Sequence, residues 1–126
     1  MNETRVGASP LKVLVVDDDL LIQMATIDMI AEMGHAVYAA ASAQEALDKV
    51  LDGEGVDLVI TDHAMPGMTG LELARKLRES RPDLPVMLAT GFDEIPGNEP
   101  GENWPRLRKP FQPDELAALM GRLCGA

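Results

Sequence analysis

The 126-residue sequence predicts an α/β fold, a doubly wound five-stranded parallel sheet with helices on both faces. Short apolar runs rich in β-branched residues alternate with longer segments of helical periodicity, which is the pattern of repeated strand–helix units. A hydrophobic content of 46% can fill the core of one domain, and with 3% aromatic residues the filling is mostly aliphatic. We expect a flexible tail over residues 1–10 and one domain over residues 11–124.

The elements follow one another along the chain in a regular order. The expected strands are residues 11–16, 37–40, 57–61, 86–89 and 107–108. The expected helices are residues 20–33, 42–52, 71–79 and 113–123. The apolar runs are short enough for strands buried on both faces, as a parallel sheet requires.

Helix boundaries have recognisable signals. Gly34 stands where a helix-closing glycine is expected. Ser42 with Glu45, and Thr69 with Glu72, form capping-box patterns that start two helices.

The rhythm breaks between Thr90 and Lys109, where a further helix is expected. Residues 93–106 contain three prolines and two glycines, which leave room for no more than about one turn of helix. We therefore expect this fourth helix to be short or missing, and the segment to be a mobile loop.

Composition excludes several classes of protein. A formal net charge of −10 disfavours nonspecific binding to nucleic acid or to an anionic membrane. One cysteine, Cys124, cannot form an internal disulfide and fits a reducing compartment as an inert thiol. The chain has no apolar run of about 18 residues and no signal-peptide pattern, so we expect a cytoplasmic protein.

Five polar residues fall at the carboxyl ends of expected strands: Asp17, Asp18, Asp62, Thr90 and Lys109. In open α/β sheets ligands bind at this edge, where the strand order reverses. Three carboxylates gathered there need a cation, and oxygen ligands favour Mg²⁺. A carboxylate beside a metal and a lysine can accept a phosphoryl group, since that transfer depends mainly on positioning and charge neutralisation.

Simpler interpretations exist for single members of this set. Asp17–Asp19 could be only a helix N-cap with acidic neighbours, and Lys109 could be a structural partner of Asp17. His63 is expected to face solvent from a loop, and His35 to lie on the surface.

Four motifs, in this order and spacing over residues 11–123, resemble those of bacterial response-regulator receiver domains. They are Val15–Asp19, Ile60–Asp62 with Met65–Gly70, Leu88–Gly91, and Lys109–Phe111. Any one of them is weak, and together they are specific. The resemblance implies a flavodoxin-like fold with strand order 2-1-3-4-5.

The resemblance also implies roles for individual residues. Asp62 would be phosphorylated by a histidine kinase or a histidine-phosphotransfer protein. Asp17, Asp18 and Asp62 would bind Mg²⁺ with the backbone carbonyl of Ala64. Thr90 would be the switch hydroxyl.

Lys109 would bind the phosphoryl group in this resemblance, with a cis peptide before Pro110. Arg106 stands where receivers often have an aromatic residue that rotates on activation. The Leu-Ala-Thr-Gly-Phe stretch ending at Phe92 resembles a subfamily with a Phe-Ala-Thr-Gly-Tyr motif and a loop in place of the fourth helix. We therefore expect loop ordering as the readout, with Phe92 hindering attack by water on the phosphoryl group.

The first helix carries apolar residues on two faces. Ile22, Ala25, Met29, Ile30 and Met33 form one stripe, expected to face the sheet. Leu20, Met24, Ile27 and Ala31 form a second stripe on roughly the opposite face. Since a surface helix needs only one apolar stripe, we expect Leu20, Met24, Ile27, Pro110 and Phe111 to form a docking surface for a partner. Self-association or chance scatter is the alternative.

These observations favour a single-domain response regulator of a phosphorelay that signals by protein contact, as a monomer or weak dimer. It would catalyse only its own phosphorylation and dephosphorylation. Three alternatives stay open: an aspartyl-nucleophile phosphatase with the Asp-x-Asp spacing of Asp17–Asp19, a flavin-binding electron carrier of the same sheet order, or a receiver cut from a hybrid histidine kinase.

Overall fold

The five strands form one parallel sheet whose order, β2-β1-β3-β4-β5, is the predicted one. The computed structural model describes residues 10–53, 55–91 and 104–124. The strands are β1 (Lys12–Val16), β2 (Ala36–Ala40), β3 (Leu58–Asp62), β4 (Val86–Thr90) and β5 (Arg106–Arg108). The order reverses between β1 and β3, so the carboxyl ends of these two central strands lie beside a switch point.

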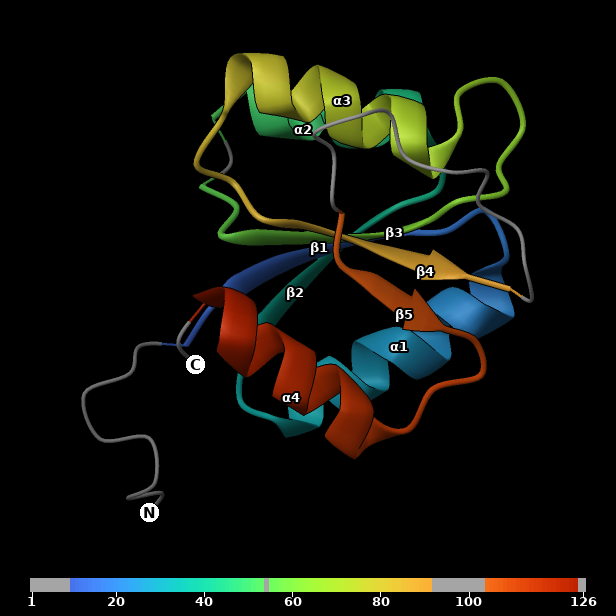
Figure 1. Cartoon of the computed structure of the whole chain (residues 1–126), viewed down its shortest axis with the longest axis vertical. Coiled ribbons are helices and arrows are strands. Elements are labelled where there is room, and N and C mark those ends of the chain that lie inside the picture. The colour runs from blue at the N-terminus through green and yellow to red at the C-terminus, as the bar shows by residue number, and fades with distance from the viewer. Residues whose placement is uncertain (1–9, 54, 92–103, 125–126) are drawn as a thin grey trace.

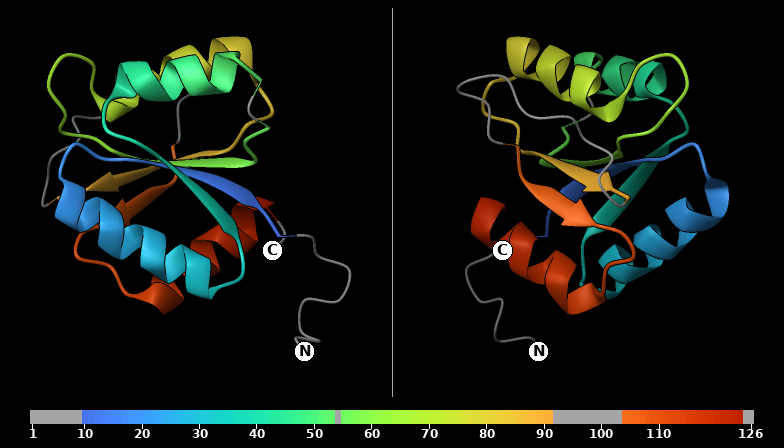
Figure 2. Two further views of the ribbon diagram at one scale, coloured as in Figure 1. Left: turned by 180° about the vertical axis from the view of Figure 1, so that it is seen from behind. Right: turned by 45° about the vertical axis from the view of Figure 1, so that its right-hand side comes forward.

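Four helices in the described residues cover the two faces of the sheet. They are α1 (Leu20–Glu32), α2 (Ala43–Leu51), α3 (Gly70–Ser80) and α4 (Pro113–Cys124). Figure 1 shows α2 and α3 on one face and α1 and α4 on the other, and the views in Figure 2 agree. Each face has its own apolar core, because alternate residues of the buried central strands point to opposite sides.

Both capping signals start a helix as the sequence predicts, but only the Thr69–Glu72 pair forms the full reciprocal box, since the Glu45 carboxylate accepts from the backbone N–H of Ala41 instead. The Thr69 side chain accepts from the backbone N–H of Glu72, and the Glu72 carboxylate accepts from that of Thr69. Ser42 caps α2 through Glu45 N–H, and Gly34 has a positive φ of 94° after α1. Because the helix starts are set locally, the observed boundaries differ from the expected ones by only a residue or two.

The prediction of a mobile loop over residues 93–106 is wrong at its end. Trp104 is 5% exposed and packs in the core beneath α2 and α3, and Arg106 begins β5. The guanidinium carbon of Arg78 lies 3.9 Å from the centre of the Trp104 ring, so a cation–π contact also stabilises the ring in its buried position. The expected short or missing fourth helix and the role of Phe92 concern residues 92–103, which lie outside the described residues.

Helix α1 is rotated relative to its apolar pattern. Ile22 is 39% exposed and Ala25 is exposed, although both were expected to face the sheet. Gln23 and Thr26 are buried there instead, each with a hydrogen bond from its side chain to a backbone carbonyl. Ile27, expected on the docking stripe, is half-buried and packs against the apolar core on the face of the sheet covered by α1 and α4. The apolar periodicity predicted the wrong inner face for α1, because polar side chains can be buried against the sheet when their hydrogen bonds are satisfied.

The prediction of a surface histidine at position 35 is also wrong. His35 is 8% exposed, and its Nδ1 accepts a hydrogen bond of 2.9 Å from the backbone N–H of Leu11. The ring thereby joins the loop after α1 to the start of β1. In the part of the chain that the structure describes, no helix is long and apolar enough to cross a membrane.

Gly70 provides a test of how closely α3 approaches β3. A Cβ at this position would collide with the backbone carbonyl oxygen of Asp62. We expect Gly70→Ala to lower the free energy of unfolding by about 2–3 kcal/mol, because the clash is with backbone and cannot be relieved by a side chain. The midpoint and slope of urea denaturation measure it.

Gly53→Ala is the matched control, since a Cβ there meets nothing within 4 Å and only the positive φ of 83° opposes it. Its cost should be about 1 kcal/mol. If the two variants lose equal stability, the close approach of α3 to Asp62 is not a constraint on the fold.

Candidate functional site

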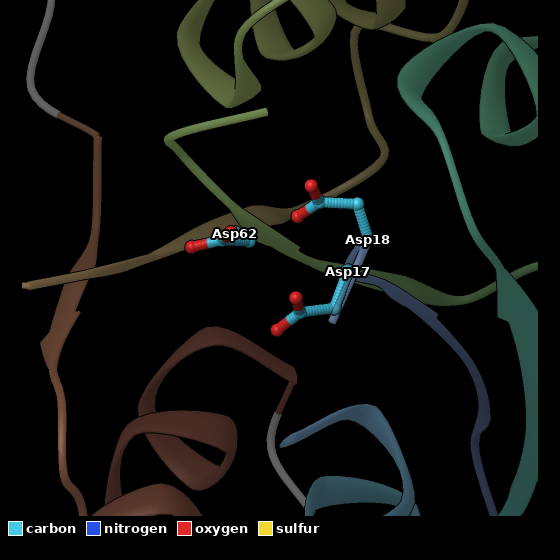
Figure 3. A group of neighbouring side chains, drawn as sticks. All are labelled: Asp17, Asp18 and Asp62. Atoms are coloured by element: carbon cyan, nitrogen blue, oxygen red, sulfur yellow. The ribbon is translucent and has the colours of Figure 1, made fainter. Parts of the chain in front are cut away.

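Three carboxylates meet where β1 and β3 end. Asp62 is the last residue of β3, and Asp17 and Asp18 follow β1 directly. Each offers a carboxylate oxygen that lies within 4.8 Å of those of the other two. Figure 3 shows the three side chains together, pointing to the same side. The parallel pairing of β1 with β3 produces this arrangement, because it brings the carboxyl ends of both strands to one edge.

The neighbouring strands bring Thr90 and Lys109 to the same edge. Thr90 ends β4 and is 7% exposed. The backbone N–H of Lys109 donates to the carbonyl of Thr90 over 2.7 Å, which fixes the two residues relative to each other. The predicted cis peptide between Lys109 and Pro110 is present.

The Lys109 ammonium group lies among the carboxylates. Its Nζ is 2.7 Å from Asp62 Oδ1 and 3.6 Å from Asp17 Oδ2. With side chains only 9% and 6% exposed, the two carboxylates are poorly hydrated, so the lysine supplies much of their charge compensation. This position agrees with the expected role of Lys109 as a partner of Asp17, and its role in binding a phosphoryl group on Asp62 stays a prediction.

The pKa of Asp17 is set by opposing effects. Burial raises its pKa above the ordinary value, and the carboxylates of Asp62 and Asp18 act in the same direction. The hydrogen bond that Asp17 accepts from the backbone N–H of Asp19, and the charge of Lys109, oppose this rise. A cation bound beside Asp17 would relieve the remaining cost of its charge.

The donor set fits a hard divalent cation such as Mg²⁺. All three candidate ligands are carboxylate oxygens, and Asp18 is exposed, so water can fill further positions. In an octahedron with bonds of about 2.1 Å, neighbouring ligands are about 3.0 Å apart and opposite ones about 4.2 Å apart. The oxygens, which lie within 4.8 Å of one another, would therefore need to approach by less than about 2 Å. Asp17, Asp18 and Asp62 could therefore hold the ion, and the carbonyl of Ala64 stays a predicted ligand.

Asp19 serves the helix instead of the site. Its side chain accepts hydrogen bonds from the backbone N–H groups of Leu21 and Ile22 and so caps α1. The N-cap interpretation of residues 17–19 therefore holds for this residue, whereas Asp17 and Asp18 turn toward Asp62.

His63 does not face solvent, and that prediction is wrong. The residue is 9% exposed, and its Nδ1 has no hydrogen-bond partner in the described part of the chain. Its backbone N–H donates to Ala89, while its carbonyl accepts from Met65 and Gly70. These three bonds hold His63 in the loop between β3 and α3, as the sequence predicts, but in a buried position near the start of α3.

An apolar groove of about 470 Å³ lies beside the site, between α1 and the segment after β5. It is lined by Leu21, Ile22, Ala25, Thr26, Met29, Lys109, Pro110 and Phe111. Leu21 is 80% exposed, and Phe111 at the groove is itself 9% exposed. Of the expected docking residues, Pro110 and Phe111 line the groove, whereas Leu20 and Met24 are exposed on α1 outside its lining.

The apolar pattern of the sequence did not predict that Leu21 lines the groove or that Gln23 is buried against the sheet. Leu21 belonged to neither expected stripe, and Gln23 is a polar residue on a face assigned from apolar residues. A polar residue within an apolar helix was the only available signal for Gln23.

The parallel sheet and this acidic edge are features of a class of signalling domains, and comparison with known proteins gives the family. Residues 13–120 match the family model of the response regulator receiver domain. The chain belongs to the response-regulator receiver family of two-component systems, whose domains are signalling proteins.

Two response regulators that are similar in sequence support the assignment. The two-component response regulator PhoP of Pseudomonas aeruginosa is 35% identical over 90% of this chain and 51% of its own length. The response regulator MprA of Mycolicibacterium vanbaalenii is 35% identical over 90% of this chain and 50% of its own length. The chain thus spans about half the length of these relatives.

Solved structures show the same fold. A response regulator receiver domain protein from Clostridium thermocellum has a TM-score of 0.84 and 25% identity, covering 91% of this chain and 94% of its own. The response regulator protein TrrA from Thermotoga maritima, solved in complex with Mg²⁺ and BeF, has a TM-score of 0.82 and 32% identity, covering 90% and 98%.

The charge cluster predicts opposite effects of one substitution on stability and on metal binding. We expect Asp17→Asn to raise the free energy of unfolding without divalent cations by on the order of 1 kcal/mol, because a buried charge among like charges is removed. Millimolar Mg²⁺ should stabilise the wild type by mass action and the variant much less. Thermal unfolding in chelator and in MgCl₂ measures both effects.

Asp28→Asn, which removes an exposed carboxylate of α1, is the control and should behave like the wild type. Loss of stability in Asp17→Asn without Mg²⁺, or full Mg²⁺ stabilisation of that variant, would contradict this account of the cluster.

Proposed function

We propose that Asp62 accepts a phosphoryl group from a phosphohistidine of a partner protein. The observation that carries the proposal is the 2.7 Å contact between Lys109 Nζ and Asp62 Oδ1 within a group of three carboxylates. An isolated surface carboxylate is a weak nucleophile toward a phosphate, because both are anions. Here a fixed cation stands beside the nucleophile, and the other two aspartates provide a site for a second cation.

The transfer exchanges one covalent bond for another. A carboxylate oxygen of Asp62 attacks phosphorus, the bond between phosphorus and the imidazole nitrogen breaks, and an acyl phosphate forms. Lys109 lies within reach of the incoming phosphoryl oxygens, and the Thr90 hydroxyl at the neighbouring strand end can donate to one of them. Mg²⁺ at Asp17, Asp18 and Asp62, with the Ala64 carbonyl, would supply further charge neutralisation.

The proposed partner is a histidine kinase or a histidine-phosphotransfer protein that docks on α1. The groove opens beside Lys109, so a helix laid against Leu21 and Pro110 would bring its own side chains near Asp62. Leu20 and Met24 extend the exposed apolar surface of α1. A cluster of exposed apolar side chains such as this one is typical of a surface that another protein covers.

We propose that the phosphoryl transfer takes place in the cytoplasm and needs only residues of the receiver domain. Both apolar cores and the five residues at the carboxyl edge lie within the described residues, so the site is assembled by the receiver itself. Signalling would then proceed by protein contact after phosphorylation.

The proposal is tested by phosphorylation of the purified chain with acetyl phosphate and Mg²⁺. We expect intact-mass measurement to show the addition of one phosphoryl group to the wild type and none to Asp62→Asn, which lacks the nucleophilic oxygen pair. Asp57→Asn, at the other end of β3, is the matched control and should be modified like the wild type. Modification of Asp62→Asn, or of no protein with acetyl phosphate and with phosphorylated histidine proteins alike, would overturn the proposal.

Docking at the groove is tested with Leu21→Glu, which places a charge on a residue that is 80% exposed and should not disturb the fold. We expect transfer from a phosphorylated histidine protein to slow by about tenfold or more, since an apolar contact is replaced by a hydrated charge. The rate with acetyl phosphate should stay unchanged, because that donor needs no docking surface.

Leu51→Glu, on an apolar residue of α2 that is 55% exposed, is the control for the added charge. Equal slowing of Leu21→Glu with both donors, or equal slowing of both variants with the protein donor, would show that the groove is not where the partner docks.

A further inference from the structure

Gln23 is a buried amide on the face of α1 that packs against the sheet. The residue is 6% exposed. Its Nε2 lies 2.9 Å from the carbonyl oxygen of Ala40, 3.3 Å from that of Val15 and 3.4 Å from that of Asp17. Three carbonyl oxygens around one atom require a hydrogen-bond donor, so the amide nitrogen, and not its oxygen, must point at the strand ends.

Two of the three carbonyls belong to the stretch of chain that carries the Asp17 and Asp18 carboxylates, and the third ends the neighbouring strand. Val15 and Asp17 flank the end of β1, and Ala40 ends β2. The Ala40 carbonyl also accepts from the backbone N–H of Asp17 over 3.1 Å. The Asp17 peptide units are therefore held on both sides by a group of bonds in which Gln23 takes part.

Gln23 is itself fixed by the helix start. Its backbone N–H donates to the carbonyl of Asp19 over 2.9 Å, and Asp19 caps α1 with its side chain. A connection therefore runs from the first turn of α1 through the Gln23 amide to the backbone of Asp17. Burying an amide is unfavourable unless it is hydrogen-bonded, so these contacts fix where the Gln23 side chain lies.

We propose that Gln23 is a positioning residue for the cation site, which acts through the backbone at Asp17 without touching the ion. It holds the turn between β1 and α1 so that the Asp17 and Asp18 carboxylates converge on Asp62. Groups that orient metal ligands from behind contribute substantially to metal affinity. The inference rests on the proposed function only in that the three aspartates bind Mg²⁺.

Gln23→Met tests the proposal, because methionine has a similar length and no donor. Both it and the wild type are first shown to be folded by circular dichroism. Titration calorimetry with MgCl₂ should then show a dissociation constant raised by on the order of tenfold in Gln23→Met. Phosphorylation by acetyl phosphate should need a correspondingly higher Mg²⁺ concentration while its rate at saturating Mg²⁺ stays near that of the wild type.

Thr26→Val is the matched control. Thr26 is buried on the same face of α1, but its hydroxyl donates to the Ile22 carbonyl of its own helix. It should lower stability without changing the Mg²⁺ dissociation constant, which separates positioning from packing. If Gln23→Met does not fold, Gln23→Asn, whose amide is one methylene further from the strands, takes its place.

Two results have different meanings. A folded Gln23 variant that binds Mg²⁺ as tightly as the wild type overturns the positioning role. A wild type that binds no Mg²⁺ overturns the proposed metal site and with it this inference.

Discussion

The meeting of three carboxylates at one sheet edge is the constraint on which the rest of this structure depends. Parallel pairing of β1 and β3 places Asp17, Asp18 and Asp62 within a few ångströms of one another. That arrangement is electrostatically unfavourable, and Lys109 stands among the charges to compensate for it. The fold thus maintains a cluster of negative charge that a bound cation would neutralise.

Holding such a cluster requires a rigid surrounding. The central strands are buried on both faces, and each face is sealed by two helices with their own apolar core. Gly70 lets α3 approach the backbone at Asp62, and the Thr69–Glu72 box fixes where that helix begins. Beneath the edge, Gln23 satisfies the carbonyls at the end of β1. Local signals and long-range packing therefore meet at the same few residues.

Two faces of helix α1 contact the region of the site. Its inner face supports the backbone of Asp17 through Gln23, and its outer face lines an apolar groove with Pro110 and Phe111. Because Lys109 lines the same groove and contacts Asp62, the proposed partner, if seated there, would lie next to Asp62. The groove lies beside the carboxylates because α1 begins shortly after β1 and the segment after β5 carries Lys109.

The sequence by itself determined the strands, the helix caps, the five polar residues at the strand ends and the parallel topology. Each of these depends on local chemistry, such as the Thr69–Glu72 pattern, or on a motif order that few folds share. Tertiary structure alone decided the rotation of α1, the burial of His35 and His63, and the place of Trp104. These depend on hydrogen-bond partners and packing surfaces contributed by distant segments, such as the Leu11 N–H for His35 and Arg78 for Trp104, which periodicity within one helix or loop does not record.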